Sequence, residues 1–132
     1  MLISMAAPSP DRAGAVLERL DLMQLKDRHP MALSGGQKQQ VAIATALVSD
    51  RKILVFDEPT SGLDLHHMKE VAEELLAIQD LGKTSLVITH DYELIASCCT
   101  HVLHLEHGEV QEQYALDNIG IQHLKEFFIG SR

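Results

Sequence analysis

Two unbroken apolar runs constrain the fold of this chain more than any other feature. They lie at residues 53–56 and within residues 85–89. Runs without polar alternation are typical of strands buried on both faces of a parallel sheet. Between them, residues 65–81 repeat apolar side chains at intervals of four and three, which is the spacing of a helix. A strand, a helix and a second strand predict an α/β layered fold.

Further helices and strands are predicted on either side of this unit. We expect helices at 11–25, 37–48, 91–97 and 116–128, two strands at 100–105 and 109–113, and an irregular leader at 1–10. Asp11 is the expected N-cap of its helix, and Gly82 the residue that ends the helix at 65–81.

Composition narrows the class of protein. The 132 residues fit one domain or a piece of one, and a net charge of −8 argues against nucleic acid or an anionic membrane surface as partner. No apolar run reaches the ~20 residues that span a bilayer, and residues 1–7 lack the basic segment of a signal peptide. Cys98 and Cys99 are the only cysteines. Because they are adjacent, no long-range disulfide can form within the chain, which suits a reducing cytoplasm.

Ser34-Gly35-Gly36-Gln37 precedes a predicted helix. The backbone N–H groups and the positive end of the dipole at a helix start favour an anion, and glycines allow a phosphate to approach the backbone. A plain glycine turn with a serine N-cap explains the same residues equally well.

Polar residues follow both apolar runs. Asp57 and Glu58 end the first, and His90 follows the second. Side chains at the carboxyl ends of parallel strands point to the crevice where such sheets bind ligands. Asp57 is placed to hold Mg²⁺, Glu58 to orient or deprotonate a water, and His90 to contact a phosphate or that water. A charged strand end with a proline turn, and a structural histidine, are the alternatives.

Two other patterns do not support sites. Gly82-Lys83-Thr84 resembles the end of a phosphate loop, but Ala77 stands where that loop needs its first glycine, and a helix precedes it. His101, His104 and His107 suggest a metal cluster. Side chains alternate between the two faces of a strand, so His104, three residues from each of the others, would point away from both. We expect surface histidines there.

Taken in order, four motifs closely resemble those of the ATP-binding cassette (ABC) ATPases. They are the signature motif at 33–37, the Walker B strand with its glutamate at 53–59, the D-loop at 61–64 and the switch histidine at 89–91. The resemblance covers roughly residues 11–113, and residues 37–47 look most like energy-coupling-factor importer ATPases. It implies an α/β, three-layer P-loop NTPase-like (ABC ATPase) fold. The fold would be partial, lacking the N-terminal Walker A portion, because no Gly-x-x-x-x-Gly-Lys-Ser/Thr sequence precedes the signature.

The resemblance also implies residue roles. Family members work as head-to-tail pairs, with each ATP between one subunit's Walker A and the other's signature. The implied roles are ATP binding for Ser34, Gly35, Gly36, Gln37 and Asp64, Mg²⁺ binding for Asp57, and catalysis for Glu58 and His90. Gln40 stands where family members usually carry arginine, which weakens a charge contact assumed at that point.

The implied function is a fragment of the ATP-hydrolysing subunit of an ABC importer, inactive alone without Walker A. Its partners would be a second ABC ATPase subunit, as homo- or heterodimer, and transmembrane transporter subunits, with no nucleic acid. It would be cytoplasmic, at the inner face of the cell membrane. Expected parts are the end of a helical subdomain at 1–33, the core at 34–113 and a helical tail at 114–132.

Two alternatives remain. The chain could be a non-catalytic interaction module that supplies a signature motif in trans to a full cassette. It could instead be a fragment of a chromosome-maintenance or DNA-repair ATPase, but Gln37, the sequence at 89–91 and the acidic charge argue against that reading.

Overall fold

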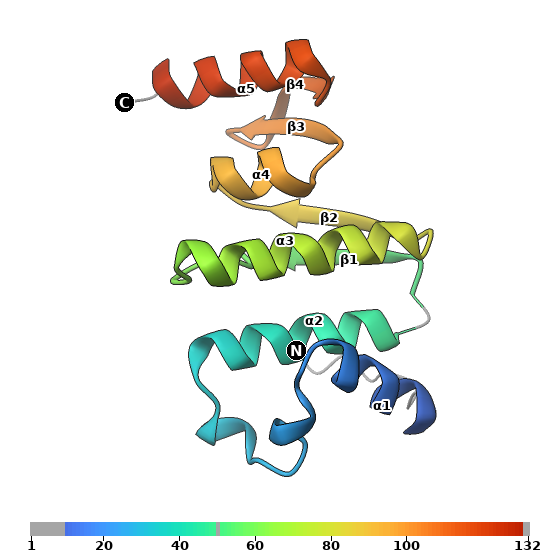
Figure 1. Cartoon of the computed structure of the whole chain (residues 1–132). Coiled ribbons are helices and arrows are strands. Elements are labelled where there is room, and N and C mark those ends of the chain that lie inside the picture. The colour runs from blue at the N-terminus through green and yellow to red at the C-terminus, as the bar shows by residue number, and fades with distance from the viewer. Residues whose placement is uncertain (1–9, 50, 131–132) are drawn as a thin grey trace. The chain divides into compact units, whose positions relative to one another are not determined.

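The computed structural model of the chain describes residues 10–49 and 51–130, which divide into two compact units at residues 88 and 89 (Figure 1). The predicted leader lies outside the described residues except for Pro10. The first unit contains α1 (Pro10–Arg19), η1 (Met23–Leu25), η2 (Pro30–Ala32), α2 (Gly35–Val48), β1 (Ile53–Asp57), α3 (Leu65–Asp80) and β2 (Thr84–Ile88). The second contains α4 (Tyr92–Cys98), β3 (His101–Glu106), β4 (Glu109–Ala115) and α5 (Asn118–Gly130).

The helix predicted at 11–25 is interrupted. It ends at Arg19, and Asp21 adopts a left-handed backbone with φ of 52° before η1 begins. This turn allows Leu22 and Leu25 to join Ala44 of α2 in a buried cluster. Packing against α2 therefore overrides helix propensity here. Asp11 lies inside α1, so the prediction that it caps the helix is wrong.

The first sheet confirms the predicted strand–helix–strand order. β1 and β2 pair in parallel, with Val55 opposite Leu86, and α3 runs alongside the pair (Figure 1). The buried side chains of α3 include Val71, Leu75 and Ile78.

Only one face of this sheet is covered among the described residues. Leu54 is buried, but the side chains that alternate with it lie on a bare aliphatic face. This face comprises Ile53, Val55, Leu86 and Ile88, which are 54–63% exposed. The prediction of strands buried on both faces is therefore wrong for this structure. The runs are apolar throughout, but the described helices cover only the Leu54 side.

The second unit is a hairpin with two helices. β3 and β4 pair in antiparallel fashion around His107 and Gly108, whose φ values of 51° and 81° suit a two-residue hairpin turn. α5 contacts the hairpin, since His123 Nε2 lies 2.8 Å from Glu112 Oε2 on β4. No helix in residues 10–49 or 51–130 is long and apolar enough to cross a membrane.

Candidate functional site

The start of α2 is held by a reciprocal pair of hydrogen bonds. The backbone N–H of Gln37 donates to Ser34 Oγ at 3.2 Å, and the N–H of Ser34 donates to Gln37 Oε1 at 3.0 Å. A helix start has four N–H groups without intrahelical acceptors. This capping box satisfies those of Ser34 and Gln37. The other two belong to Gly35 and Gly36, and N–H groups at a helix start favour an anion.

The start of α2 lies beside the loop at residues 61–64. A Cβ atom on Gly36 would lie 3.7 Å from Leu63 Cδ2, an ordinary contact, and one on Gly35 would meet nothing within 4 Å. Further along, the Gln40 side chain donates to Glu70 Oε2 at 3.4 Å, which ties α2 to α3. The structure thus brings together two of the predicted motifs, the signature turn and the D-loop.

Asp57 and Glu58 lie at the carboxyl end of β1, as predicted. Asp57 is exposed and pairs in register with Ile88, the last residue of β2. The N–H of Glu58 donates to the Ile88 carbonyl at 2.8 Å, so both strand ends meet at this edge. Glu58 has a φ of 46°, in the left-handed region that non-glycine residues rarely adopt. The backbone therefore turns sharply at this carboxylate.

Asp64 has a structural task that the motif alone did not reveal. It is the N-cap of α3, and its Oδ1 accepts from the N–H of His67 at 2.9 Å and lies 2.8 Å from His67 Nδ1. The backbone hydrogen bond from His67, followed by the ring contact, holds the pKa of Asp64 below its ordinary value.

His90 belongs to the second unit, where it is exposed and follows Thr89. Asp91 caps α4 by accepting from the N–H groups of Glu93 and Leu94 at 3.0 and 3.3 Å. The structure therefore places His90 directly before a capped helix, and its role beside Glu58 stays a prediction.

The exposed carboxylate of Asp57 fits the part of one oxygen ligand to Mg²⁺. Among the residues that the structure describes, no group of three His, Cys, Asp or Glu side chains could hold a metal ion. A magnesium ion at Asp57 would therefore take most of its oxygen ligands from phosphates and water, which is usual for this ion.

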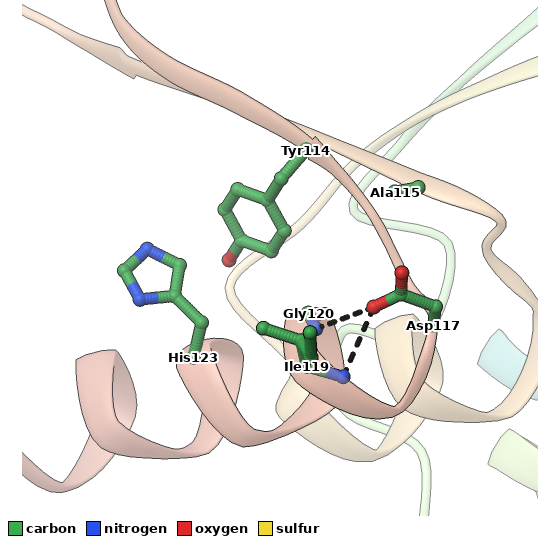
Figure 2. Close-up of a pocket in the computed structure, with 6 residues that line it drawn as sticks. All are labelled: Tyr114, Ala115, Asp117, Ile119, Gly120 and His123. Atoms are coloured by element: carbon green, nitrogen blue, oxygen red, sulfur yellow. Dashed lines mark hydrogen bonds between the residues drawn. The ribbon is translucent and has the colours of Figure 1, made fainter.

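Sequence reasoning missed a hollow in the second unit. A cavity of about 260 Å³ lies where the start of α5 meets β4, lined by Tyr114, Ala115, Asp117, Ile119, Gly120 and His123 (Figure 2). Burial raises the pKa of Tyr114. The close approach of α5 to β4 depends on how the two elements pack, and no sequence motif predicts it.

Comparison with known proteins agrees with the motifs. The ABC transporter family matches residues 7–61. The chain is 48% identical over 105 residues to a putative ABC transporter ATP-binding protein of Treponema denticola, covering 79% of the chain and 22% of that protein. It is 40% identical over 102 residues to the arginine transport ATP-binding protein ArtP of Haemophilus influenzae, covering 77% and 42%. The chain thus spans less than half the length of these two relatives.

Solved cassettes have a similar fold. The chain is similar to cbiO1 of Clostridium perfringens, part of the ABC transporter complex cbiONQ, with a TM-score of 0.74 and 32% identity over 98% of the chain and 53% of cbiO1. It is also similar to the dimeric bacterial ABC transporter cassette MJ0796, with a TM-score of 0.71 and 30% identity over 87% of the chain and 52% of the cassette. These neighbours confirm the predicted ABC ATPase type of α/β fold.

Proposed function

Because this chain belongs to the ABC transporter ATP-binding family, we propose that it forms part of the ATP-hydrolysing subunit of an importer. The observation that carries the proposal is the capped turn at Ser34, in which two glycines begin a helix next to the D-loop. An importer is favoured by the similarity to an arginine transport protein. The resemblance of residues 37–47 makes an energy-coupling-factor importer the finer proposal.

The signature turn would bind the terminal phosphate of ATP held by a second cassette. Gly35 and Gly36 would donate their N–H groups, and Ser34 its hydroxyl. Gln37 acts through the cap that fixes this turn. Asp64 holds the adjoining loop through its contacts with the first turn of α3.

The carboxylates at the end of β1 would serve hydrolysis. Glu58 would orient or deprotonate the attacking water, and His90 would contact the phosphate or that water. Asp57 would hold Mg²⁺, directly or through water, and the bound ion would neutralise phosphate charge. The left-handed backbone of Glu58 aims its side chain away from the direction that a continued strand would give it.

The partners would be a second cassette, as homo- or heterodimer, and transmembrane subunits that choose the substrate. The similarity to a dimeric cassette supports the first of these. The chain would then work in the cytoplasm at the inner face of the membrane. Bulk charge gives it no attraction for nucleic acid.

We further propose that a polypeptide of these 132 residues does not hydrolyse ATP by itself. Phosphoryl transfer in P-loop enzymes relies on a phosphate-binding loop with its lysine, and no such sequence occurs in residues 1–132. Joined to a cassette half that supplies this loop, the chain should hydrolyse ATP, and Glu58→Gln should stop turnover while ATP still binds. Turnover by the chain alone that Glu58→Gln abolishes would contradict the proposal, and loss of ATP binding in the joined variant would show that Glu58 has another role.

The signature turn is tested by capture on a full-length ABC cassette whose own catalytic glutamate has been replaced. The chain should bind this cassette with ATP and much less with ADP, because the terminal phosphate is the group it contacts. Gly36→Asp should abolish capture, since it places a carboxylate beside a polyanion.

Gly36→Asn is the matched control for this test. It adds the same bulk without the charge, and its Cβ would meet Leu63 only at ordinary contact distance. Capture should therefore fall less than in Gly36→Asp. Equal capture with ATP and ADP, or undiminished capture of the Gly36→Asp chain, would show that the turn does not bind the terminal phosphate.

The same capture experiment addresses the second candidate, an interaction module that supplies only a signature motif. The completeness of the capped turn within this chain favours that candidate. ATP-dependent capture, with no turnover even after joining to a phosphate-binding half, would select it over the hydrolytic subunit.

A further inference from the structure

The two cysteines lie next to each other at the end of α4, and their surroundings differ. Cys98 is the last residue of the helix and is 3% exposed. Cys99 is the C-cap and is only partly buried. Neither cysteine is in a disulfide.

Hydrogen bonding also makes the two thiols unlike. Cys98 Sγ lies 3.2 Å from the carbonyl oxygen of Leu94, one turn earlier. The interaction between the two neighbouring thiols lowers the pKa of Cys99, whereas this interaction and burial raise the pKa of Cys98. A buried thiol is therefore followed directly by a partly exposed one, so solvent and small oxidants reach Cys99 first. The lowered pKa of Cys99 acts in the same direction, because the thiolate is the reactive form of cysteine.

We propose that Cys99 and Cys98 form a peroxide-reactive dithiol, with Cys99 as the attacking sulfur and Cys98 as the resolving one. The Cys99 thiolate attacks one oxygen of a hydroperoxide, the O–O bond breaks, and hydroxide or alkoxide leaves. Cys99 becomes a sulfenic acid. The Cys98 thiol then attacks that sulfur, the S–S bond forms, and water leaves. With hydrogen peroxide, two thiols are oxidised to a disulfide and the peroxide is reduced to two waters.

The adjacency of the residues makes this disulfide easy to reduce. Neighbouring α-carbons lie ~3.8 Å apart across a trans peptide, whereas disulfides usually join α-carbons ~4.4–6.8 Å apart. The described chain contains no cis peptide bonds. A strained disulfide has a more oxidising potential, so cellular thiols would reverse it.

Oxidation would act on the last turn of α4. That turn is closed by the Cys99 N–H, which donates to the Ile95 carbonyl at 3.1 Å. Closing a small ring through Cys98 and Cys99 must shift this backbone. α4 has seven residues, and its N-cap, Asp91, directly follows His90.

The inference does not rest on ATP hydrolysis, because thiol chemistry is measured without nucleotide.

The test treats the whole chain and two matched variants, Cys98→Ala and Cys99→Ala, with a small excess of hydrogen peroxide and the sulfenic-acid trap dimedone. Intact mass and thiol titration follow the products. The unmodified chain should lose both thiols without a dimedone adduct and recover them with dithiothreitol. Cys98→Ala should accumulate the dimedone adduct on Cys99, and Cys99→Ala should react at least about ten-fold more slowly.

Several results would overturn the proposal. Equal rates for the two variants would remove the distinction between the thiols. A dimedone adduct on the unmodified chain, or a cross-linked dimer on a non-reducing gel, would show that Cys98 does not resolve the sulfenic acid.

A second measurement does not need the buried Cys98 to be replaced. Phenylarsine oxide joins two neighbouring thiols through one arsenic atom and releases water. It should bind the unmodified chain in a one-to-one ratio and consume both thiols, while Cys99→Ala should lose this binding. Failure of the unmodified chain to take up one arsenical with loss of both thiols would also contradict the proposal.

Discussion

The carbonyl oxygen of Ala115 occupies the space where a side chain on Gly120 would begin. A Cβ atom on Gly120 would lie only 1.9 Å from that oxygen. The first turn of α5 is held there by Asp117, which accepts from the N–H groups of Ile119 and Gly120 at 3.0 and 2.9 Å (Figure 2). Gly120 therefore permits the close contact between β4 and α5.

Gly120→Ala should strongly destabilise the second unit. Backbone atoms cannot yield as a flexible side chain does, so the expected loss is at least the ~1–3 kcal/mol typical of overpacking. Urea unfolding followed by circular dichroism measures it. Gly14→Ala is the matched control, because its Cβ would meet nothing within 4 Å in α1, and alanine in a helix should add about 1 kcal/mol of stability. Equal effects of the two substitutions would show that α5 does not approach β4 this closely.

Replacing Glu58 should reveal backbone strain at the candidate catalytic residue. With φ of 46°, a residue with a Cβ is strained by ~1–2 kcal/mol that glycine escapes. Glu58→Gly should therefore melt at a higher temperature than Glu58→Ala, since both lose the carboxylate and differ only in the Cβ. Asp80, in helix α3, is the control position: there the alanine variant should melt at a higher temperature than the glycine variant. Alanine more stable than glycine at position 58 would contradict the left-handed backbone.

The cap of α3 should weaken in acid. Contacts with His67 lower the pKa of folded Asp64, so its carboxylate stabilises the folded state above the ordinary aspartate pKa of about 3.9. This contribution is lost as the pH falls through the lowered pKa. Asp64→Ala should melt below the unmodified chain at neutral pH, and the difference should shrink in acid. Asp64→Asn, which can cap without charge, should show less pH dependence; a constant difference across the range would argue against this cap.

The bare aliphatic face should promote self-association. Val55 and Leu86 are paired neighbours on the adjacent strands β1 and β2, and they are 61% and 54% exposed. Exchanging both for threonine should reduce aggregation in sedimentation velocity while shifting stability by only ~0.5 kcal/mol, as exposed positions usually do. Leu75→Ala is the contrasting control, because Leu75 is 0% exposed and its truncation should cost ~2–5 kcal/mol. Unchanged sedimentation of the threonine variant would show that this face does not mediate association.

Local signals in the sequence predicted most of the elements. Ser34 and Asp91 cap their helices, and Gly82, with φ of 70°, ends α3 where glycine was expected. Each feature depends on a few neighbouring residues, so the local amino-acid sequence is enough to predict it. The carboxylates at the end of β1 were placed correctly for the same reason.

Non-local features were missed. The turn at Asp21 depends on packing against α2, and the closeness of Gly36, in the first turn of α2, to Leu63 involves residues far apart in the sequence. An apolar strand does not show which of its faces is covered, because that depends on the layers packed against it. The roles assigned to Glu58 and His90 stay predictions, since geometry alone does not test chemistry.

The different connections within the two sheets should set an order of folding. β3 and β4 are joined by two residues, whereas Ile53 pairs with Thr84 only after the whole of α3 has intervened. Hairpins form in about 1–10 μs, and pairing between distant segments is slower because a long loop must close first. After rapid dilution from denaturant, amide protons of the hairpin should thus become protected from exchange before those of β1 and β2. The aliphatic strands β1 and β2 should therefore find each other later than the strands of the hairpin do.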